Sequence, residues 1–161
     1  MKAIPNNIFF EQVIDLLGKG EKVKITVQGT SMKPFFQSGK DQVTLTSVRD
    51  NTKKSRHTSL RRGDVILFQY KDQFILHRIY HIHGTLIIAR GDNCYGTCEK
   101  ITTADVYALA ESGTCFGQHF NFRSNGPVWC SIAWFWRHTY KLRKYMLHLK
   151  HALTFRKKKQ Q

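Results

Sequence analysis

Residues 73–90, QFILHRIYHIHGTLIIAR, predict a β-hairpin, and this hairpin decides the fold class. Both halves are rich in β-branched and aromatic residues, and the pair His83–Gly84 between them is typical of a two-residue turn. Other stretches show the alternation or clustering of apolar residues that strands have, namely 23–27, 43–45, 64–70 and 105–112. The chain is therefore expected to be mainly β.

The turn of the hairpin determines which side chains face each other across its two strands. With His83–Gly84 as the turn, counting outward places His77 opposite Arg90. Asp92 is then the diagonal neighbour of His77, about 7–8 Å away at the backbone and within reach of a side-chain contact. A slip of one residue would break this relationship. The predicted register therefore offers Asp92 as an acid that orients His77.

Composition indicates one folded domain with an unevenly distributed charge. Of the 161 residues, 41% are apolar and 12% are aromatic, as in a protein with a packed core. The net charge is +15; no Asp or Glu follows Glu111, whereas ten of the 26 Lys and Arg residues do. This asymmetry favours an anionic partner, with an anionic membrane surface preferred over nucleic acid.

The N-terminal stretch MKAIPNNIFFEQVIDLL does not have the pattern of a secretion signal, because Glu11 and Asp15 interrupt it. The four cysteines are therefore expected to be reduced thiols rather than disulfides. These features predict a cytoplasmic location, with peripheral association at a membrane as a further option.

Three segments are predicted: a helix in 1–22, a β core in 23–116 and a basic, aromatic-rich helical tail in 117–161. The first helix carries its apolar residues on one face and is stopped by Gly18 and Gly20. In the tail, apolar residues recur every three or four positions from 132 to 153, with basic residues off that stripe. Such a basic amphipathic helix can lie on a membrane or dock on the β core, and the sequence leaves both open.

Four short motifs follow one another along the β core: GTSMKP (29–34), RRGDVILF (61–68), ILHRI (75–79) and RGDN (90–93). In this order they resemble the serine peptidase superfamily that includes signal peptidase I and the self-cleaving LexA-type repressors. Most bacterial members have a lysine base directly before an arginine. Here His77 precedes Arg78, which is similar to the archaeal and endoplasmic-reticulum signal peptidases. The resemblance covers roughly residues 23–110.

The resemblance implies a signal-peptidase or LexA-like β core with Ser31 as the nucleophile and His77 as the general base. It implies that Asp92 holds the imidazole ring by its other nitrogen. Backbone amides of Ser31 and at Gly29 would bind the oxyanion. A peptide or protein substrate would bind in extended form. The chemistry is coherent, because neutral imidazole can take the serine proton at neutral pH.

Two departures from the family pattern bear on this hypothesis. Signal peptidases have a membrane-spanning anchor before the serine, and no apolar stretch of that length precedes Ser31. Their acidic motif has a further Asp about six residues after the first, and here that place is Cys98, with Glu99 beside it. The third catalytic residue is therefore Asp92 or Glu99.

A metal site is a rival interpretation of some of the same residues. His77, His81 and His83 share one predicted strand face, and Cys94 and Cys98 follow, which are ligand types that suit zinc. Their spacing matches no common structural-zinc pattern, so neither a metal nor another cofactor is expected.

The functional hypothesis is a serine endopeptidase with a Ser31–His77 dyad that cleaves a peptide or precursor protein. An ordinary alternative for Ser31 is a turn residue whose hydroxyl bonds its own backbone. The alternative from another functional class is a non-catalytic basic module that binds an anionic membrane surface or nucleic acid.

Overall fold

The computed structural model describes residues 6–48, 60–94, 96–115, 117–122, 131–132, 134–136 and 138–139. Along the chain the elements are α1 (Asn6–Gly18), β1 (Val23–Thr26), β2 (Gln42–Ser47), β3 (Val65–Tyr70), β4 (Gln73–His83), β5 (Leu86–Arg90), β6 (Glu99–Thr102), the 3-10 turn η1 (Thr103–Asp105), β7 (Val106–Cys115) and β8 (Gln118–Asn121). The prediction of a mainly β protein with a short N-terminal helix is confirmed.

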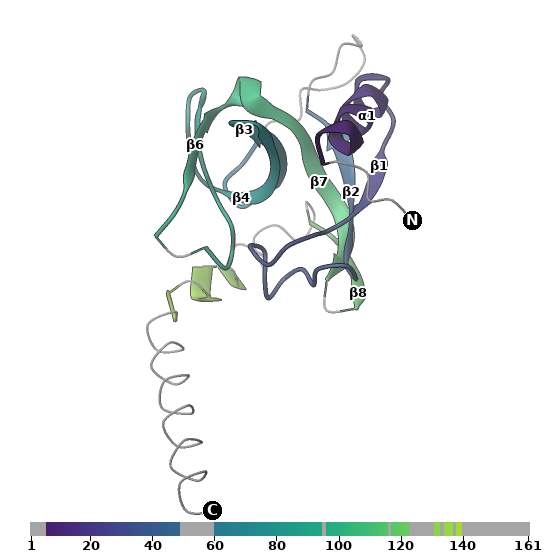
Figure 1. The fold of residues 1–161 in the computed structure, drawn as a ribbon. Helices are drawn as coiled ribbons and strands as arrows, with labels where there is room; N and C mark the ends of the chain where they lie inside the picture. The colour runs from purple at the N-terminus through teal and green to yellow at the C-terminus, as the bar shows by residue number, and fades with distance from the viewer. Residues whose placement is uncertain are drawn as a thin grey trace, which may run out of the picture.

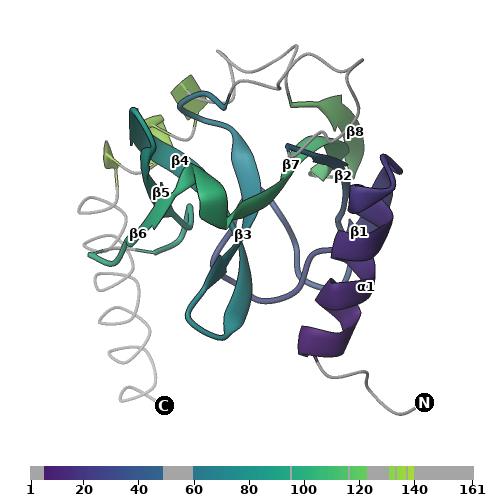
Figure 2. The same cartoon turned by 90° about the horizontal axis from the view of Figure 1, so that it is seen from above.

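The strands form one antiparallel sheet in the order β1-β2-β7-β3-β4-β5-β6, and β8 pairs with β7. The sheet curls, and β7 connects its β1–β2 part to its β3–β6 part (Figure 1). Seen from above, α1 lies alongside β1 and β2, on the side of the molecule away from β5 and β6 (Figure 2). The curl therefore separates two regions that a flat sheet would place in one plane.

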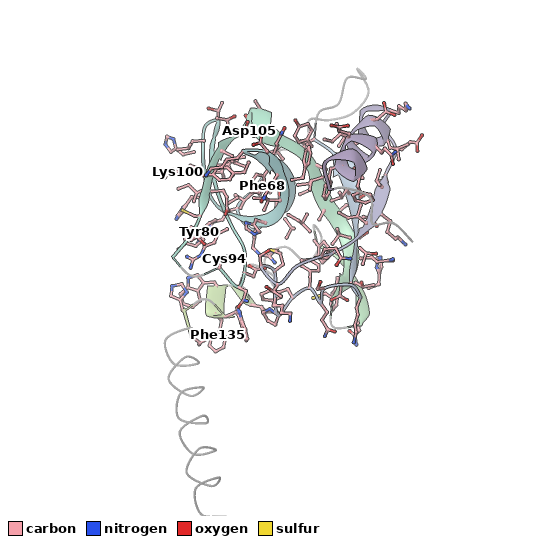
Figure 3. The ribbon with its side chains drawn as sticks, in the orientation of Figure 1. Phe68, Tyr80, Cys94, Lys100, Asp105 and Phe135 are labelled. Carbon is pink, nitrogen blue, oxygen red and sulfur yellow. The ribbon has the colours of Figure 1, made fainter. Side chains whose placement is uncertain are left out.

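Two clusters of buried side chains fill the curled sheet, and β3 contributes to both. Val65 and Leu67 belong to the cluster under α1, whereas Ile66 and Phe68 belong to the cluster shared with β4, β5 and β6. Phe68 lies inside the curl of the sheet (Figure 3). This explains why β3 is a continuous apolar run rather than an alternating one, since both of its faces are covered.

The helix α1 packs through one face, as its sequence predicts. Val13 and Leu17 are buried in the first cluster, and Phe10 packs against that cluster from its edge. These residues lie three or four positions apart, so they fall on one side of the helix. Helix α1 is thereby held against β1, β2 and β4 by hydrophobic contact.

Two strands were not expected from the sequence. β6 has a single buried apolar residue, Ile101, which gives too short a pattern for a strand to be recognised. β8 lies within 117–161, the range predicted as a helical tail, and pairs with β7 through Cys115↔Gln118. The β core thus continues to residue 122, because Gly117, with φ at +76°, allows a tight turn after β7.

The predicted register of the β4–β5 hairpin is wrong. His83 pairs with Leu86, so the turn residues are Gly84–Thr85 rather than His83–Gly84. Gly84 has φ at +58°, a left-handed conformation that suits glycine and places it inside the turn. A register shift between Ile79 and His81 then inserts one extra residue in β4.

These two changes move the pairing at the far end of the hairpin by one residue. Arg78, not His77, lies opposite Arg90. The side chains of a strand point alternately to opposite faces, so the shift exchanges the face that each neighbour presents. The acid placed diagonal to His77 by the predicted register is consequently aligned with Arg78.

The predicted C-terminal helix lies mostly outside the described residues. Within the described part of the tail, residues 131–132 and 134–136 are helical. In the ranges that the structure describes, no helix is both long and apolar enough to cross a bilayer.

Candidate active site

Ser31 lies in a turn that directly follows β1 and the buried Val27. Gly29 begins this turn with φ at +87°, a conformation that L side chains rarely adopt. After Ser31, the buried side chains of Met32, Phe35 and Phe36 anchor the segment in the core. Ser31 itself is half-buried. The turn therefore places the serine near the surface, and the buried residues that follow it fix its position.

His77 lies on β4 and is held by a carboxylate. Its side chain is buried, and its Nδ1 is 2.8 Å from Oε2 of Glu99, the first residue of β6. A carboxylate only accepts hydrogen bonds, so Nδ1 carries the hydrogen and donates it to Glu99. Nε2 of the neutral ring is then left with a lone pair. This arrangement gives His77 the tautomer that a general base requires.

Gly91 marks the place where His77 and the Ser31 turn approach each other. A Cβ on Gly91 would lie 2.7 Å from the backbone oxygen of Ser31, 2.8 Å from Sγ of Cys94 and 2.9 Å from Nε2 of His77. Nε2 and the Ser31 backbone oxygen therefore both border a position that only glycine leaves open. The serine turn and the histidine, 46 positions apart in the sequence, meet here.

Asn93 fastens the two loops together beside this point. Its backbone N–H donates to the Ser31 carbonyl oxygen at 2.7 Å, and its side-chain amide donates to the Thr30 carbonyl oxygen at 3.3 Å. The Ser31 turn is thus fixed relative to the segment that follows β5.

Asp92 does not contact His77 but forms a buried ion pair with Arg78. The guanidinium donates from Nε and from the terminal nitrogen Nη2 to the Asp92 carboxylate, at 2.8–3.2 Å, and both side chains are buried. Arg78 also donates to the Gly63 carbonyl oxygen at 2.9 Å and lies over the Phe35 ring. The predicted Asp92–His77 contact is therefore replaced by an Arg78–Asp92 pair that joins three loops.

The two amides predicted for an oxyanion hole differ in availability. The Gly29 N–H donates to Oγ of Ser38 at 3.0 Å, so this hydrogen bond already occupies it. The Ser31 N–H has no hydrogen-bond partner among the residues that the structure describes. Of the two predicted donors, Ser31 alone remains open to a ligand oxygen in this conformation.

The hydroxyl of Ser31 makes no hydrogen bond to His77 or to any other residue in the described ranges. Such contacts are often long without a substrate and tighten when one binds. Ser31 and His77 nevertheless line the same cleft, together with residues of α1, β1 and β4.

This cleft has a volume of about 860 Å³ and is bordered by two strand edges. Within the described sheet, β1 pairs only with β2, and residues 73–77 of β4 pair only with β3. Consecutive residues line the cleft on both sides, namely 24–28, which run from β1 into the segment after it, and 74–77 of β4. An unpaired strand edge presents backbone donors and acceptors that an extended peptide can pair with.

Cys94 is the residue of the site that sequence reasoning assigned to a rival role. Its thiol is half-buried, and both Sγ of Cys94 and Nε2 of His77 lie within 2.9 Å of the position that a Cβ on Gly91 would occupy. Burial raises the pKa of the Cys94 thiol, and the Glu99 carboxylate raises it further. Cys94 is therefore a protonated, neutral neighbour of the histidine at neutral pH.

The zinc ligands considered from the sequence do not converge. The inserted residue of β4 breaks the alternation between His77 and His81, so His77 is buried while His81 and His83 are exposed. Among the parts of the chain that are described, no three His, Cys, Asp or Glu side chains are placed to hold a metal.

Sequence reasoning missed the buried Arg78–Asp92 pair and the close approach at Gly91. The position of Glu99 was signalled only by its place beside Cys98, where the family pattern has an acid.

No family model, no curated protein and no solved structure matches this chain.

Proposed function

We propose that this chain is a serine endopeptidase in which Ser31 is the nucleophile, His77 the general base and Glu99 the residue that orients the base. The observation that carries the proposal is the position of His77: Nδ1 is bound to Glu99, and Nε2 borders the same space beside Gly91 as the Ser31 backbone oxygen. The four motifs that resemble signal peptidases and LexA-type repressors support the same assignment. Asp92 is not assigned a catalytic role; it binds Arg78 and holds that side chain in place.

In the proposed reaction, Ser31 Oγ attacks the carbonyl carbon of the scissile peptide bond, and its proton passes to Nε2 of His77. The Glu99 carboxylate stabilises the imidazolium that forms. The Ser31 N–H donates to the developing oxyanion. The imidazolium then returns the proton to the leaving amine, and water hydrolyses the acyl-enzyme by the same base.

The cleft supports a peptide substrate in extended form. A strand placed between the open edges of β1 and of residues 73–77 can hydrogen-bond to both through its backbone. The scissile bond would lie at the end of the cleft where Ser31 and His77 are found.

A serine-directed fluorophosphonate probe tests the nucleophile. Wild-type protein should be labelled at Ser31, and Ser31→Ala and His77→Ala should each abolish labelling. Ser112→Ala, a serine on β7 away from the cleft, is the matched control and should label like the wild type. The mechanism would be contradicted if both Ser31→Ala and His77→Ala were still labelled, or if the probe labelled another serine. Peptide hydrolysis should follow the labelling, with the double variant little worse than either single one.

A second candidate function is binding to an anionic membrane surface. Ile132, Trp134 and Phe135 are 45%, 49% and 63% exposed in a segment that precedes a run of basic residues. Trp134 and Phe135 also line a cavity of about 530 Å³ together with Arg62. Exposed aromatic side chains beside cationic ones are typical of proteins that lie at a membrane interface. This function is compatible with the peptidase and would bring its cleft to membrane-bound substrates.

A further inference from the structure

The N-terminal helix forms part of the wall of the cleft that holds Ser31 and His77. Phe9 and Phe10 of α1 line this cleft. Their rings lie edge to face with centroids 5.1 Å apart, and Phe10 lies 5.2 Å from the ring of Phe74 on β4. The three rings form one aromatic surface, which we call the Phe9–Phe10–Phe74 wall.

Phe9 is the open part of this wall. Val13 and Leu17 bury the same helix in the core, whereas the side chain of Phe9 is 36% exposed. The remaining lining of the cleft is mostly apolar, and Lys24 is the one Lys, Arg, Asp or Glu among its described lining residues. An apolar group entering the cleft would cover the exposed part of Phe9 and remove it from water, which is favourable.

The wall has a fixed separation from the catalytic residues. Phe74 precedes His77 by three positions on β4, and a strand rises about 3.3 Å per residue. Phe74, where the wall meets β4, therefore lies about 10 Å from His77 along the strand, which is about three residues of an extended peptide.

We propose that the Phe9–Phe10–Phe74 wall is a specificity site that selects peptides with a large apolar side chain about three residues from the scissile bond. The inference rests on the proposed peptidase function and adds the substrate class. The helix then serves a function beyond covering the core, since it supplies side chains that read the substrate. Small or charged side chains at that position would leave the ring of Phe9 partly in water or bury a charge against it.

A peptide library with every side chain varied around one cleavage site tests the proposal. Wild-type protein should prefer Phe, Leu or Met over Ala at one position about three residues from the cleaved bond. Phe9→Ala should lower kcat/KM for these peptides about tenfold and leave the peptide with Ala there almost unchanged. Leu86→Ala is the matched control, because Leu86 is likewise an exposed apolar residue, on β5 and outside the cleft. It should alter neither value.

The outcomes separate this inference from the peptidase proposal. Cleavage with no apolar preference, or an apolar preference that Phe9→Ala leaves intact, would overturn the specificity site and spare the peptidase. If no peptide is cleaved and no probe labels Ser31, the peptidase fails. In that case the same peptides are titrated against Ser31→Ala and Ser31→Ala/Phe9→Ala by fluorescence anisotropy. Weaker binding of the apolar peptides to the second protein supports the wall, and equal binding or no binding overturns it.

Discussion

Glu99 accepts a hydrogen bond from Nδ1 of His77 at 2.8 Å, between two strands that are not neighbours in the sheet. β5 separates β4 from β6, and the side chain of Glu99, the first residue of β6, reaches past it to His77. The side chains of both residues are at least 86% buried, so water does not compete strongly for the bond. This relationship fixes the histidine ring and distinguishes Glu99 from Asp92.

If Glu99 orients His77, Glu99→Gln should lower the rate of peptide hydrolysis by about 10²–10⁴-fold, because the amide no longer stabilises the imidazolium. Circular dichroism and the unfolding midpoint should change little. Glu111→Gln, which removes a partly exposed carboxylate paired with Lys22, is the control and should keep full activity. If Glu99→Gln kept full activity, Glu99 would not be the residue that orients His77, and the third catalytic residue would have to be a different one.

The Arg78–Asp92 pair should matter for stability. Asp92→Ala leaves the Arg78 guanidinium buried without its partner, which should lower the free energy of unfolding by about 3–5 kcal/mol. Urea denaturation measures this. Asp15→Ala removes an exposed partner of Lys19 and should hardly change the unfolding midpoint. The variant Arg78→Ala/Asp92→Ala should be less destabilised than the sum of its single variants. Equal effects of Asp92→Ala and Asp15→Ala would contradict a structural role for the pair.

Gly91 should tolerate no side chain. In Gly91→Ala the new Cβ would lie within 2.9 Å of the Ser31 backbone oxygen and of Nε2 of His77, so the serine turn and the histidine must move apart. Labelling of Ser31 by the fluorophosphonate probe should fall at least tenfold, because small displacements of reacting groups have effects of about that size or larger. Gly96→Ala is the control: it lies in the same loop, and its Cβ would meet no atom within 4 Å. Since Gly96 has φ at +90°, its variant is expected to lose some stability but to keep its labelling.

The thiols should differ in reactivity and in their effect on stability. Burial raises the pKa of the Cys115 thiol to about 12, and this thiol donates to the Phe35 carbonyl oxygen. Its protonated form is favoured in the folded state, so its contribution to stability is complete below about pH 9. That contribution is lost as the pH rises above 9, where the unfolded chain releases the proton first. Urea unfolding at pH 7 and pH 10, repeated with Cys115→Ala, should show a smaller decrease in the variant.

Alkylation by iodoacetamide, followed by peptide mapping, gives an independent measure of the same thiols. Cys98 is exposed and should react first, Cys94 should react more slowly because burial and Glu99 raise its pKa, and Cys115 should react only on unfolding. Rapid alkylation of Cys115 in the folded protein would show that its environment is more open than its burial indicates.

Membrane association should depend on charge and on the exposed aromatic residues. Sedimentation with vesicles rich in phosphatidylserine should be strong at low salt and weak at high salt, since each surface charge contributes about 1 kcal/mol and is screened by ions. Deletion of 128–161 should abolish it. Trp134→Ala/Phe135→Ala keeps the charge and should weaken it, whereas Leu86→Ala is the control. Unchanged sedimentation of the deletion variant would exclude the tail as the binding surface. If the deletion unfolds the core, the point variants alone decide.

The sequence by itself determined the mainly β fold, the N-terminal helix and the candidates Ser31 and His77. Strands β1, β2, β3, β4, β5 and β7 have apolar patterns that can be recognised locally, and α1 has its apolar residues at helical spacing. The serine and histidine were found because each lies in a short motif that is complete within a few residues.

Only the tertiary structure decided which acid contacts His77. The prediction of Asp92 depended on the register of the β4–β5 hairpin, and the position of Gly84 together with the extra residue before His81 changed that register. A bulge of this kind has no local sequence signature here, and one inserted residue exchanges the faces of all the side chains beyond it. Glu99 reaches His77 because the sheet curls, and the curl is a property of all its strands together. Gly91 likewise has a role only because the Ser31 turn packs against it from 60 residues away.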